Sequence, residues 1–240
     1  MAMQRVLITG GSRGVGRATA LRLAREGVAV AVLARDAKSV DAAVRAVNAA
    51  GGRGIAAVAD VGDSAAVARA VSEAIDALGG LDGLVLNAGS AVNGPVETYG
   101  IADWNATLAT NLTGAFLVAQ AALPALKKTG GTNDEARIVA VASGAAYAGY
   151  PNLSAYCAAK WGLRGFMLAL AEEVKGDGIR CCTLSPGSIL TEFGGGDPVA
   201  KAAQPGRAYL TPEHVADTIY YLLHQPAHVW TQEMNLWPVM

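Results

Sequence analysis

Short runs of apolar residues alternate along the chain with longer segments in which apolar positions recur every three or four residues. The short runs are predicted strands at residues 6–8, 28–33, 55–58, 84–86, 138–141 and 179–184. The longer segments are predicted helices at residues 14–26, 37–50, 64–78, 103–128 and 154–175. Strands that are apolar at almost every position indicate a parallel sheet buried on both faces. The alternation therefore predicts an α/β fold, doubly wound, with helices on both sides of the sheet.

No linker or repeat interrupts this alternation, so residues 1–240 are expected to form a single domain. Residues 129–135 are predicted to be an exposed loop, because they are polar and rich in Gly. A second irregular segment, at about residues 192–208, contains several Gly and Pro residues and follows a predicted strand end. Ligands bind at such strand ends in α/β proteins, so we expect a short mobile substrate lid there.

Composition narrows the class of protein. The 240 residues are 52% hydrophobic and 16% charged, with a formal net charge of -1, so nucleic acid is not an expected partner. Three cysteines, Cys157, Cys181 and Cys182, suggest core residues in a reducing compartment, and no recurring ligand spacing suggests a metal site. The N-terminus runs directly into a strand, and no apolar run approaches the roughly 20 residues of a membrane span. We therefore expect a cytoplasmic protein without a signal peptide or membrane segment.

A glycine-rich turn joins the first predicted strand to the first helix, in Thr9-Gly10-Gly11-Ser12-Arg13-Gly14-Val15-Gly16. Glycines permit a tight turn and a close approach of the backbone to a ligand, and the helix N-terminus offers free N–H groups to a pyrophosphate. A glycine-rich turn alone is a weak signal, and its position between a strand and a helix favours a dinucleotide site much more strongly. The residues expected to contact the cofactor here are Gly10, Ser12, Arg13, Gly14, Val15 and Gly16.

The end of the second strand bears on the choice between NAD and NADP. NAD-binding proteins usually carry Asp or Glu at this strand tip, but here Ala34 stands there and Arg35 follows. Arg35 and Arg13 together suit a 2′-phosphate, so NADP is favoured and NAD is less expected. Arg35 could instead be a solvated loop charge, and Asp36 is placed to cap the next helix.

A tyrosine and a lysine lie four residues apart on the last predicted long helix. Tyr156 and Lys160 therefore share one face of that helix. A nearby cation lowers the pKa of a phenol from its usual value of about 10, which improves the phenol as an acid–base catalyst. The spacing alone also occurs by chance on helix faces. It gains weight from Ser143, which ends the fifth predicted strand thirteen residues before Tyr156.

Together these residues resemble the short-chain dehydrogenase/reductase family, in its single-domain branch of about 250 residues with a Tyr-x-x-x-Lys active site. The resemblance covers nearly the whole chain and implies a single NADP-binding Rossmann domain with a parallel seven-stranded sheet. The catalytic set that it implies is Asn111, Ser143, Tyr156 and Lys160. Further cofactor contacts that it implies are Asp60, Val61, Asn87, Ala88, Gly89, Tyr156, Lys160, Pro186, Gly187, Ile189 and Thr191. Leu86 departs from the family motif Asn-Asn-Ala-Gly by replacing its first Asn, and Asp60 could also be a plain turn residue.

The resemblance implies reduction of a ketone or aldehyde by NADPH, with Tyr156 as the proton donor. The alternatives are an NAD(P)-dependent alcohol or polyol dehydrogenase working in the oxidative direction, and a 3-oxoacyl-carrier-protein reductase. The expected partners are a small-molecule substrate and further copies of the chain, as a homodimer or homotetramer. An apolar pocket near Tyr156 would favour a hydrophobic or aromatic substrate; its candidate lining residues are Trp104, Ala145, Tyr147, Tyr150 and Phe193.

Overall fold

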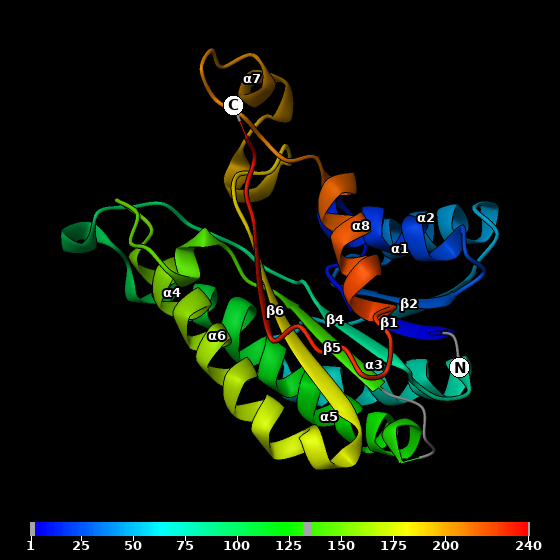
Figure 1. The fold of residues 1–240 in the computed structure, drawn as a ribbon. Helices are drawn as coiled ribbons and strands as arrows, with labels where there is room; N and C mark the ends of the chain where they lie inside the picture. The colour runs from blue at the N-terminus through cyan, green and yellow to red at the C-terminus, as the bar shows by residue number, and fades with distance from the viewer. Residues whose placement is uncertain (1–2, 132–135, 240) are drawn as a thin grey trace.

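The computed structural model describes residues 3–131 and 136–239, which form a seven-stranded sheet with helices on both faces (Figure 1). All six strand pairings are parallel, in the order β3-β2-β1-β4-β5-β6-β7. The strands are β1 Arg5–Thr9, β2 Ala29–Ala34, β3 Arg53–Val58, β4 Gly83–Leu86, β5 Ala136–Val141, β6 Ile179–Pro186 and β7 Glu233–Leu236. The doubly wound Rossmann-type fold is thus confirmed. Its strand order reverses direction between β1 and β4, the point at which such folds bind ligands.

Helices cover both faces of the sheet. The α-helices are α1 Gly14–Ala24, α2 Ala37–Ala49, α3 Ser64–Leu78, α4 Ile101–Leu108, α5 Gly114–Gly130, α6 Ser154–Val174, α7 Pro198–Ala202 and α8 Pro212–Leu223. Short 3₁₀ turns lie at η1 Val96–Thr98, η3 Gly144–Ala146, η4 Lys175–Asp177 and η5 Phe193–Gly195, and a π-helical turn, η2, spans Ala109–Thr113. Buried residues of α1, α2 and α8 pack on one face of the sheet, and those of α3, α5 and α6 pack on the other.

Alternation of side chains along each strand divides the core into these two layers. Val6 and Ile8 of β1 belong to the layer under α1 and α8, whereas Leu7 belongs to the layer under α3, α5 and α6. All three residues are fully buried. This burial on both faces is the reason that the strands are apolar at nearly every position.

Side-chain caps fix where several helices begin. Asp36 accepts a hydrogen bond from the Ser39 amide at 2.8 Å, so its expected role as the cap of α2 is confirmed. Thr211 and His214 form a reciprocal cap at the start of α8. Neither α8 nor β7 was located from the sequence. β7 is short and only half-buried, so its residues lack the continuous apolar signal of the inner strands.

The long helix expected at residues 103–128 differs from the prediction. It runs from Ile101 to Gly130 with the π-helical turn η2 in its middle, so Thr129 and Gly130 are helical and not part of a loop. Residues 132–135 of the expected loop lie outside the described part of the chain. The stretch Ile101–Gly130 is long and apolar enough to cross a membrane by length and composition alone, with a mean hydropathy of 1.3 over a window of 18 residues. That corrects the expectation that no such stretch exists, although core helices meet the same criterion and α5 packs on the sheet.

The segment expected to be a lid contains a helix. Asp197 accepts a hydrogen bond from the Val199 amide at 2.9 Å and caps α7, which projects beyond the sheet in Figure 1. The segment follows the C-terminal end of β6 and so lies at the ligand-binding edge of the sheet. Its mobility stays a prediction.

Candidate active site

Helix α6 presents Tyr156 and Lys160 toward the end of β5. Lys160 is only 3% exposed, and its Nζ donates a hydrogen bond to the Val141 carbonyl at 2.9 Å. The same Nζ lies 5.5 Å from the centre of the Tyr156 ring. Burial lowers the pKa of Lys160 to about 8, because an ammonium group loses its hydration in the interior. The expected pairing of the two side chains on one helix face is present.

The phenol of Tyr156 behaves differently from the sequence expectation. Burial raises its pKa to about 12; a hydrogen bond with Ser143 acts in the opposite direction, and nearby Cys157 adds a smaller increase. The expected lowering of this pKa by Lys160 is therefore wrong for the structure as it stands. Loss of hydration is the largest influence on this phenol, and the Lys160 ammonium donates its hydrogen bond to the Val141 carbonyl. The phenol remains protonated at neutral pH, which is the form that can donate a proton.

Ser143 joins Tyr156 in spite of the thirteen residues between them. It follows β5 and precedes the 3₁₀ turn η3, with an extended backbone at φ -178° and ψ 165°. Its Oγ accepts a hydrogen bond from the Ala145 amide at 3.2 Å, and its hydroxyl also hydrogen-bonds Tyr156. A hydroxyl and a phenol that share a hydrogen bond can both contact one oxygen atom of a bound carbonyl group.

Asn111 lies in the π-helical turn η2 and is 1% exposed. Its Nδ2 donates to the Ser90 carbonyl at 2.7 Å and to the Thr107 carbonyl at 2.9 Å. Within the described residues its Oδ1 has no hydrogen-bond partner. Gly89 permits this close approach, since a β-carbon there would lie 2.9 Å from Asn111 Oδ1. A π-helical turn is often found at functional sites, and it places a buried, unpaired acceptor beside the strand-end loop after β4.

The glycine-rich turn has the shape that a pyrophosphate needs. Gly10 and Gly14 have positive φ values of 63° and 52°. A β-carbon at Gly16 would lie 2.3 Å from the Gly10 carbonyl oxygen, so only glycine fits. Within the described chain, α1 begins without a side-chain cap or an acidic residue in its first turn. Its N–H groups are therefore available to an anion.

Asn87 supports this turn from the end of β4. Its Nδ2 donates to the carbonyls of Thr9 at 3.0 Å and Gly10 at 3.3 Å. The Thr9 hydroxyl in turn accepts from the amides of Asn87 and Ala88, both at 2.9 Å. Asn87 thus holds the phosphate-binding turn in place. Leu86, the departure from the family motif, is buried in the core and takes no part in these bonds.

The two arginines expected to select NADP are exposed, and each faces a carboxylate. Arg35 lies 3.6 Å from Asp60, and Arg13 lies 4.0 Å from Glu192. Asp60 also accepts a hydrogen bond from the Gly62 amide at 2.9 Å, so it orders the turn after β3. These arginines lie beside the same end of the sheet as the glycine-rich turn.

The turn after β6 comes next to the glycine-rich turn. A β-carbon at Gly14 would lie 3.6 Å from Thr191 Cγ2, which places Thr191 beside the start of α1. The Ile189 carbonyl accepts from the Thr191 amide at 3.0 Å, and the Lys201 Nζ donates to the Thr191 carbonyl at 2.8 Å. The other predicted cofactor residues lie in these turns or directly beside them: Ser12, Val15, Val61, Ala88, Gly89, Pro186 and Gly187.

Aromatic side chains surround Tyr156, but not all those expected. The ring centres of Phe193 and Tyr156 are 5.5 Å apart, which confirms Phe193 as a neighbour of the site. Tyr150 has its hydroxyl beside Gly144, next to Ser143. The Tyr147 hydroxyl instead donates a hydrogen bond to Glu233 at 3.0 Å, so Tyr147 has a structural role. Sequence reasoning missed Trp237, whose indole ring also lies against Gly144.

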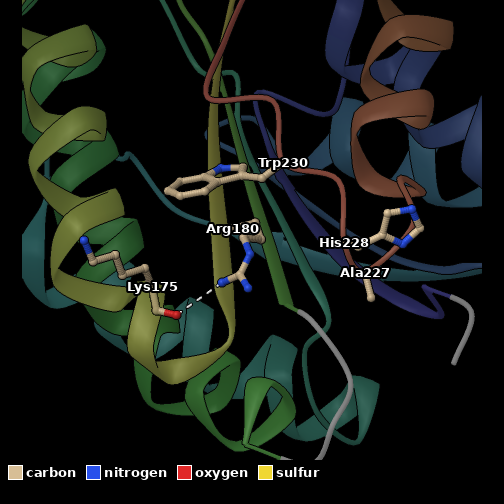
Figure 2. A pocket seen from close by; sticks show the side chains of 5 residues that line it. All are labelled: Lys175, Arg180, Ala227, His228 and Trp230. Atoms are coloured by element: carbon tan, nitrogen blue, oxygen red, sulfur yellow. Dashed lines mark hydrogen bonds between the residues drawn. The ribbon is translucent and has the colours of Figure 1, made fainter.

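A hollow elsewhere on the surface does not coincide with this site. Figure 2 shows it near the start of β6, at the edge of the sheet opposite Ser143. Arg180 donates there to the Lys175 carbonyl at 3.2 Å and lies 5.7 Å from the Trp230 ring centre. Within residues 3–131 and 136–239, no group of three His, Cys, Asp or Glu side chains could hold a metal ion.

The sequence matches the family model of the short chain dehydrogenases over residues 4–198. The chain belongs to the short-chain dehydrogenase family. A D-threitol dehydrogenase of Mycolicibacterium smegmatis is 34% identical over 92% of this chain and 86% of the relative. A 3-oxoacyl-[acyl-carrier-protein] reductase of Synechocystis is 35% identical over 95% of this chain and 92% of the relative.

A solved structure from the same family has the same architecture. It is an alcohol dehydrogenase of the archaeon Thermococcus sibiricus, complexed with 5-hydroxy-NADP, and it is 28% identical to this chain. The match covers 98% of this chain and 96% of that protein, with a TM-score of 0.88. Membership of the family makes this chain a nucleotide-binding oxidoreductase that acts on CH–OH or carbonyl groups.

Proposed function

We propose that the protein is an NADPH-dependent carbonyl reductase that uses Tyr156 as its general acid. The observation that carries the proposal is the convergence of Ser143, Tyr156 and Lys160 at the end of β5. The glycine-rich turn lies close by, at the ligand-binding edge of the same sheet. The shape of that turn and the uncapped N-terminus of α1 fit a dinucleotide.

Each residue of the site has a distinct part in the reaction. NADPH supplies the hydride when it is bound. The Ser143 hydroxyl binds the substrate oxygen and stabilises the negative charge that develops there. Tyr156 donates its phenolic proton to that oxygen, which completes the alcohol, and regains a proton from solvent. Lys160 holds a positive charge beside the phenol, and Asn111 offers its free Oδ1 to the route along which the proton returns.

The proposed cofactor preference depends on Arg13 and Arg35. Both guanidinium groups are exposed beside the nucleotide end of the sheet, where a 2′-phosphate would meet them. The relative solved with 5-hydroxy-NADP supports a site of this kind. Replacing both arginines with Ala is expected to raise the KM for NADPH at least tenfold more than the KM for NADH. Equal kinetics with both cofactors in the wild-type enzyme would contradict the preference.

The relatives include proteins named for each direction of the reaction, a dehydrogenase and a reductase. The phenol of Tyr156 is protonated at neutral pH, and this is the form that donates a proton in the reductive direction. Oxidation of an alcohol needs the phenolate and is therefore the second candidate. A comparison of initial rates at pH 7, with NADPH plus ketone and with NADP plus alcohol, separates the two directions.

The decisive experiment is Tyr156→Phe, read as loss of NADPH absorbance with a panel of ketones and aldehydes. Turnover should fall by at least two orders of magnitude, while the affinity for NADPH stays within about threefold. Tyr221→Phe, an exposed tyrosine on α8, is the matched control and should leave turnover unchanged. Near-normal turnover in Tyr156→Phe would refute the assignment.

We further propose that the single domain works in the cytoplasm as a homodimer or homotetramer. Phe116 of α5 and Trp161 and Leu168 of α6 are large apolar residues with exposed fractions of 43%, 49% and 37%. Apolar residues gathered on two neighbouring helices are typical of a contact between subunits. Light scattering after size-exclusion chromatography tests this, and a particle of 24.4 kDa would refute assembly.

A further inference from the structure

The C-terminal segment after β7 reaches the active site through Trp237. β7 pairs with β6 so that Leu236 lies opposite Pro186, and the Leu236 carbonyl accepts from the Gly187 amide at 2.8 Å. Trp237 is the next residue and so arrives beside the turn that follows β6. In Figure 1 the red C-terminal segment runs past the end of the sheet toward the lid side of the molecule.

The indole of Trp237 lies between the two turns that border the catalytic residues. A β-carbon at Gly144 would be 2.6 Å from Trp237 Cη2, and one at Gly187 would be 2.8 Å from Trp237 Cε3. Both turns therefore have a glycine where the six-membered ring is seated, and a larger residue at either position would displace it. Gly144 directly follows Ser143, so the ring lies next to the group that binds the substrate oxygen.

The strand that carries Trp237 is held firmly in place. Glu233 of β7 accepts hydrogen bonds from both Arg164 of α6 and Tyr147. The Arg164 guanidinium also stacks 4.4 Å from the centre of the Tyr147 ring. Arg164 lies one helical turn beyond Lys160 on the same helix. The contact therefore fixes β7 relative to the catalytic face of α6 and presents a rigid ring to the site.

Trp237 remains accessible despite these contacts. It is 52% exposed. Two other exposed aromatic residues lie beside the catalytic residues. The Tyr150 hydroxyl would lie 3.2 Å from a β-carbon at Gly144, and the Phe193 ring contacts the Tyr156 ring. Large apolar side chains left exposed around polar catalytic groups mark a ligand site. Flat aromatic faces prefer other flat π-systems over saturated groups of equal size.

We propose that Trp237 is a specificity-determining residue, which forms one wall of the substrate pocket and selects carbonyl compounds with an aromatic ring next to the carbonyl group. Tyr150 and Phe193 complete the aromatic surroundings of that ring. This inference rests on the proposed carbonyl reductase function. It deepens that function by naming a substrate class, the aryl ketones and aryl aldehydes.

The test compares two ketones that differ only in the saturation of the ring, acetophenone and cyclohexyl methyl ketone. The measured quantity is the ratio of their kcat/KM values, so that intrinsic reactivity cancels between enzyme variants. Trp237→Ala should lower the ratio about tenfold, whereas Trp237→Phe, which keeps a flat ring, should stay within about threefold of wild type. Tyr221→Ala, at an exposed tyrosine on α8 away from the site, should leave the ratio unchanged. A ratio that Trp237→Ala leaves unchanged overturns the proposal.

A binding measurement separates failure of this inference from failure of the proposed function. Acetophenone and cyclohexyl methyl ketone are titrated under ligand-observed NMR into the protein loaded with NADP, the oxidised cofactor, which cannot reduce them. Tighter binding of acetophenone that Trp237→Ala abolishes supports the role of Trp237, even if the wild type reduces neither ketone and the reductase assignment fails. Equal binding of the two ketones to wild type overturns the role of Trp237, whatever the activity.

Discussion

Lys160→Met is expected to stabilise the protein while it removes activity. Lys160 is 3% exposed, so its ammonium group is buried next to the catalytic residues. Folding lowers its pKa from 10.5 to about 8, so the native state binds that proton less tightly than the unfolded chain does. This difference in pKa corresponds to a penalty of about 3 kcal/mol at neutral pH. Methionine fills a similar volume and carries no charge.

The net gain is smaller than this penalty, because the variant also loses the hydrogen bond from Nζ to the Val141 carbonyl. A hydrogen bond from a charged group contributes about 1.5 kcal/mol, which leaves Lys160→Met more stable than wild type by roughly 1.5–2 kcal/mol at pH 7. The penalty is fully present below the folded pKa and disappears as the pH rises toward 10.5. The advantage of the variant should therefore shrink by about 2 kcal/mol between pH 7 and about pH 9.5.

Urea unfolding of wild type and variant at both pH values gives the difference in their free energies of unfolding and its change with pH. Contributions from other titrating groups cancel in this comparison. Lys38→Met, which replaces an exposed lysine of α2, is the control variant measured at the same two pH values. The reasoning is refuted if Lys160→Met is less stable than wild type at pH 7 and the difference is the same at pH 9.5.

Three further predictions concern the phosphate turn, the β7 contact and the pH profile. Gly16→Ala places a β-carbon 2.3 Å from the Gly10 carbonyl oxygen and should weaken NADPH binding at least tenfold, as measured by fluorescence titration. The control is Gly165→Ala on α6, where no neighbour lies within 4 Å of the new β-carbon; it should stabilise the helix by about 0.5 kcal/mol. The hydrogen bond from Arg164 lowers the pKa of Glu233, so the Glu233 carboxylate stabilises the fold at neutral pH and loses this effect as the pH falls below 4.5. In thermal unfolding, Glu233→Gln should be less stable than wild type at pH 7, and this difference should disappear in acid. The kcat/KM for reduction should be constant near neutral pH and should fall above about pH 8, where Lys160 loses its proton. A kcat/KM that rises with pH would contradict this and show that the reaction requires the phenolate form of Tyr156.

The order of the motifs was readable from the sequence because parallel strands end at one edge of a sheet. Ser143, Asn87 and Gly187 each follow a different strand in the chain, and the sheet necessarily brings these strand ends together. The helical spacing of Tyr156 and Lys160 likewise determines that they share a face. In these cases local pattern and fold class together were sufficient.

Other features depend on contacts that no local pattern records. The π-helical turn around Asn111 inserts its extra residue into an otherwise regular helix, so the apolar spacing gives no signal of it. Trp237 meets Gly144 only because β7 takes its place at the sheet edge. The pKa of Tyr156 was mispredicted because a pairwise argument about Lys160 leaves out burial, which is the largest influence.

The proposed cofactor preference depends on two exposed arginines, Arg13 and Arg35, and on the carboxylates that they face. The sequence places two arginines near the expected 2′-phosphate, and the structure gives each a carboxylate partner, Glu192 for Arg13 and Asp60 for Arg35. Ion pairs this exposed contribute at most about 1 kcal/mol. A phosphate dianion forms stronger, charge-assisted hydrogen bonds with guanidinium groups, so it displaces a carboxylate at small cost. In the proposed preference for NADPH, the phosphate would therefore replace weak carboxylate partners of Arg13 and Arg35, and one of these, Glu192, lies in the expected lid segment.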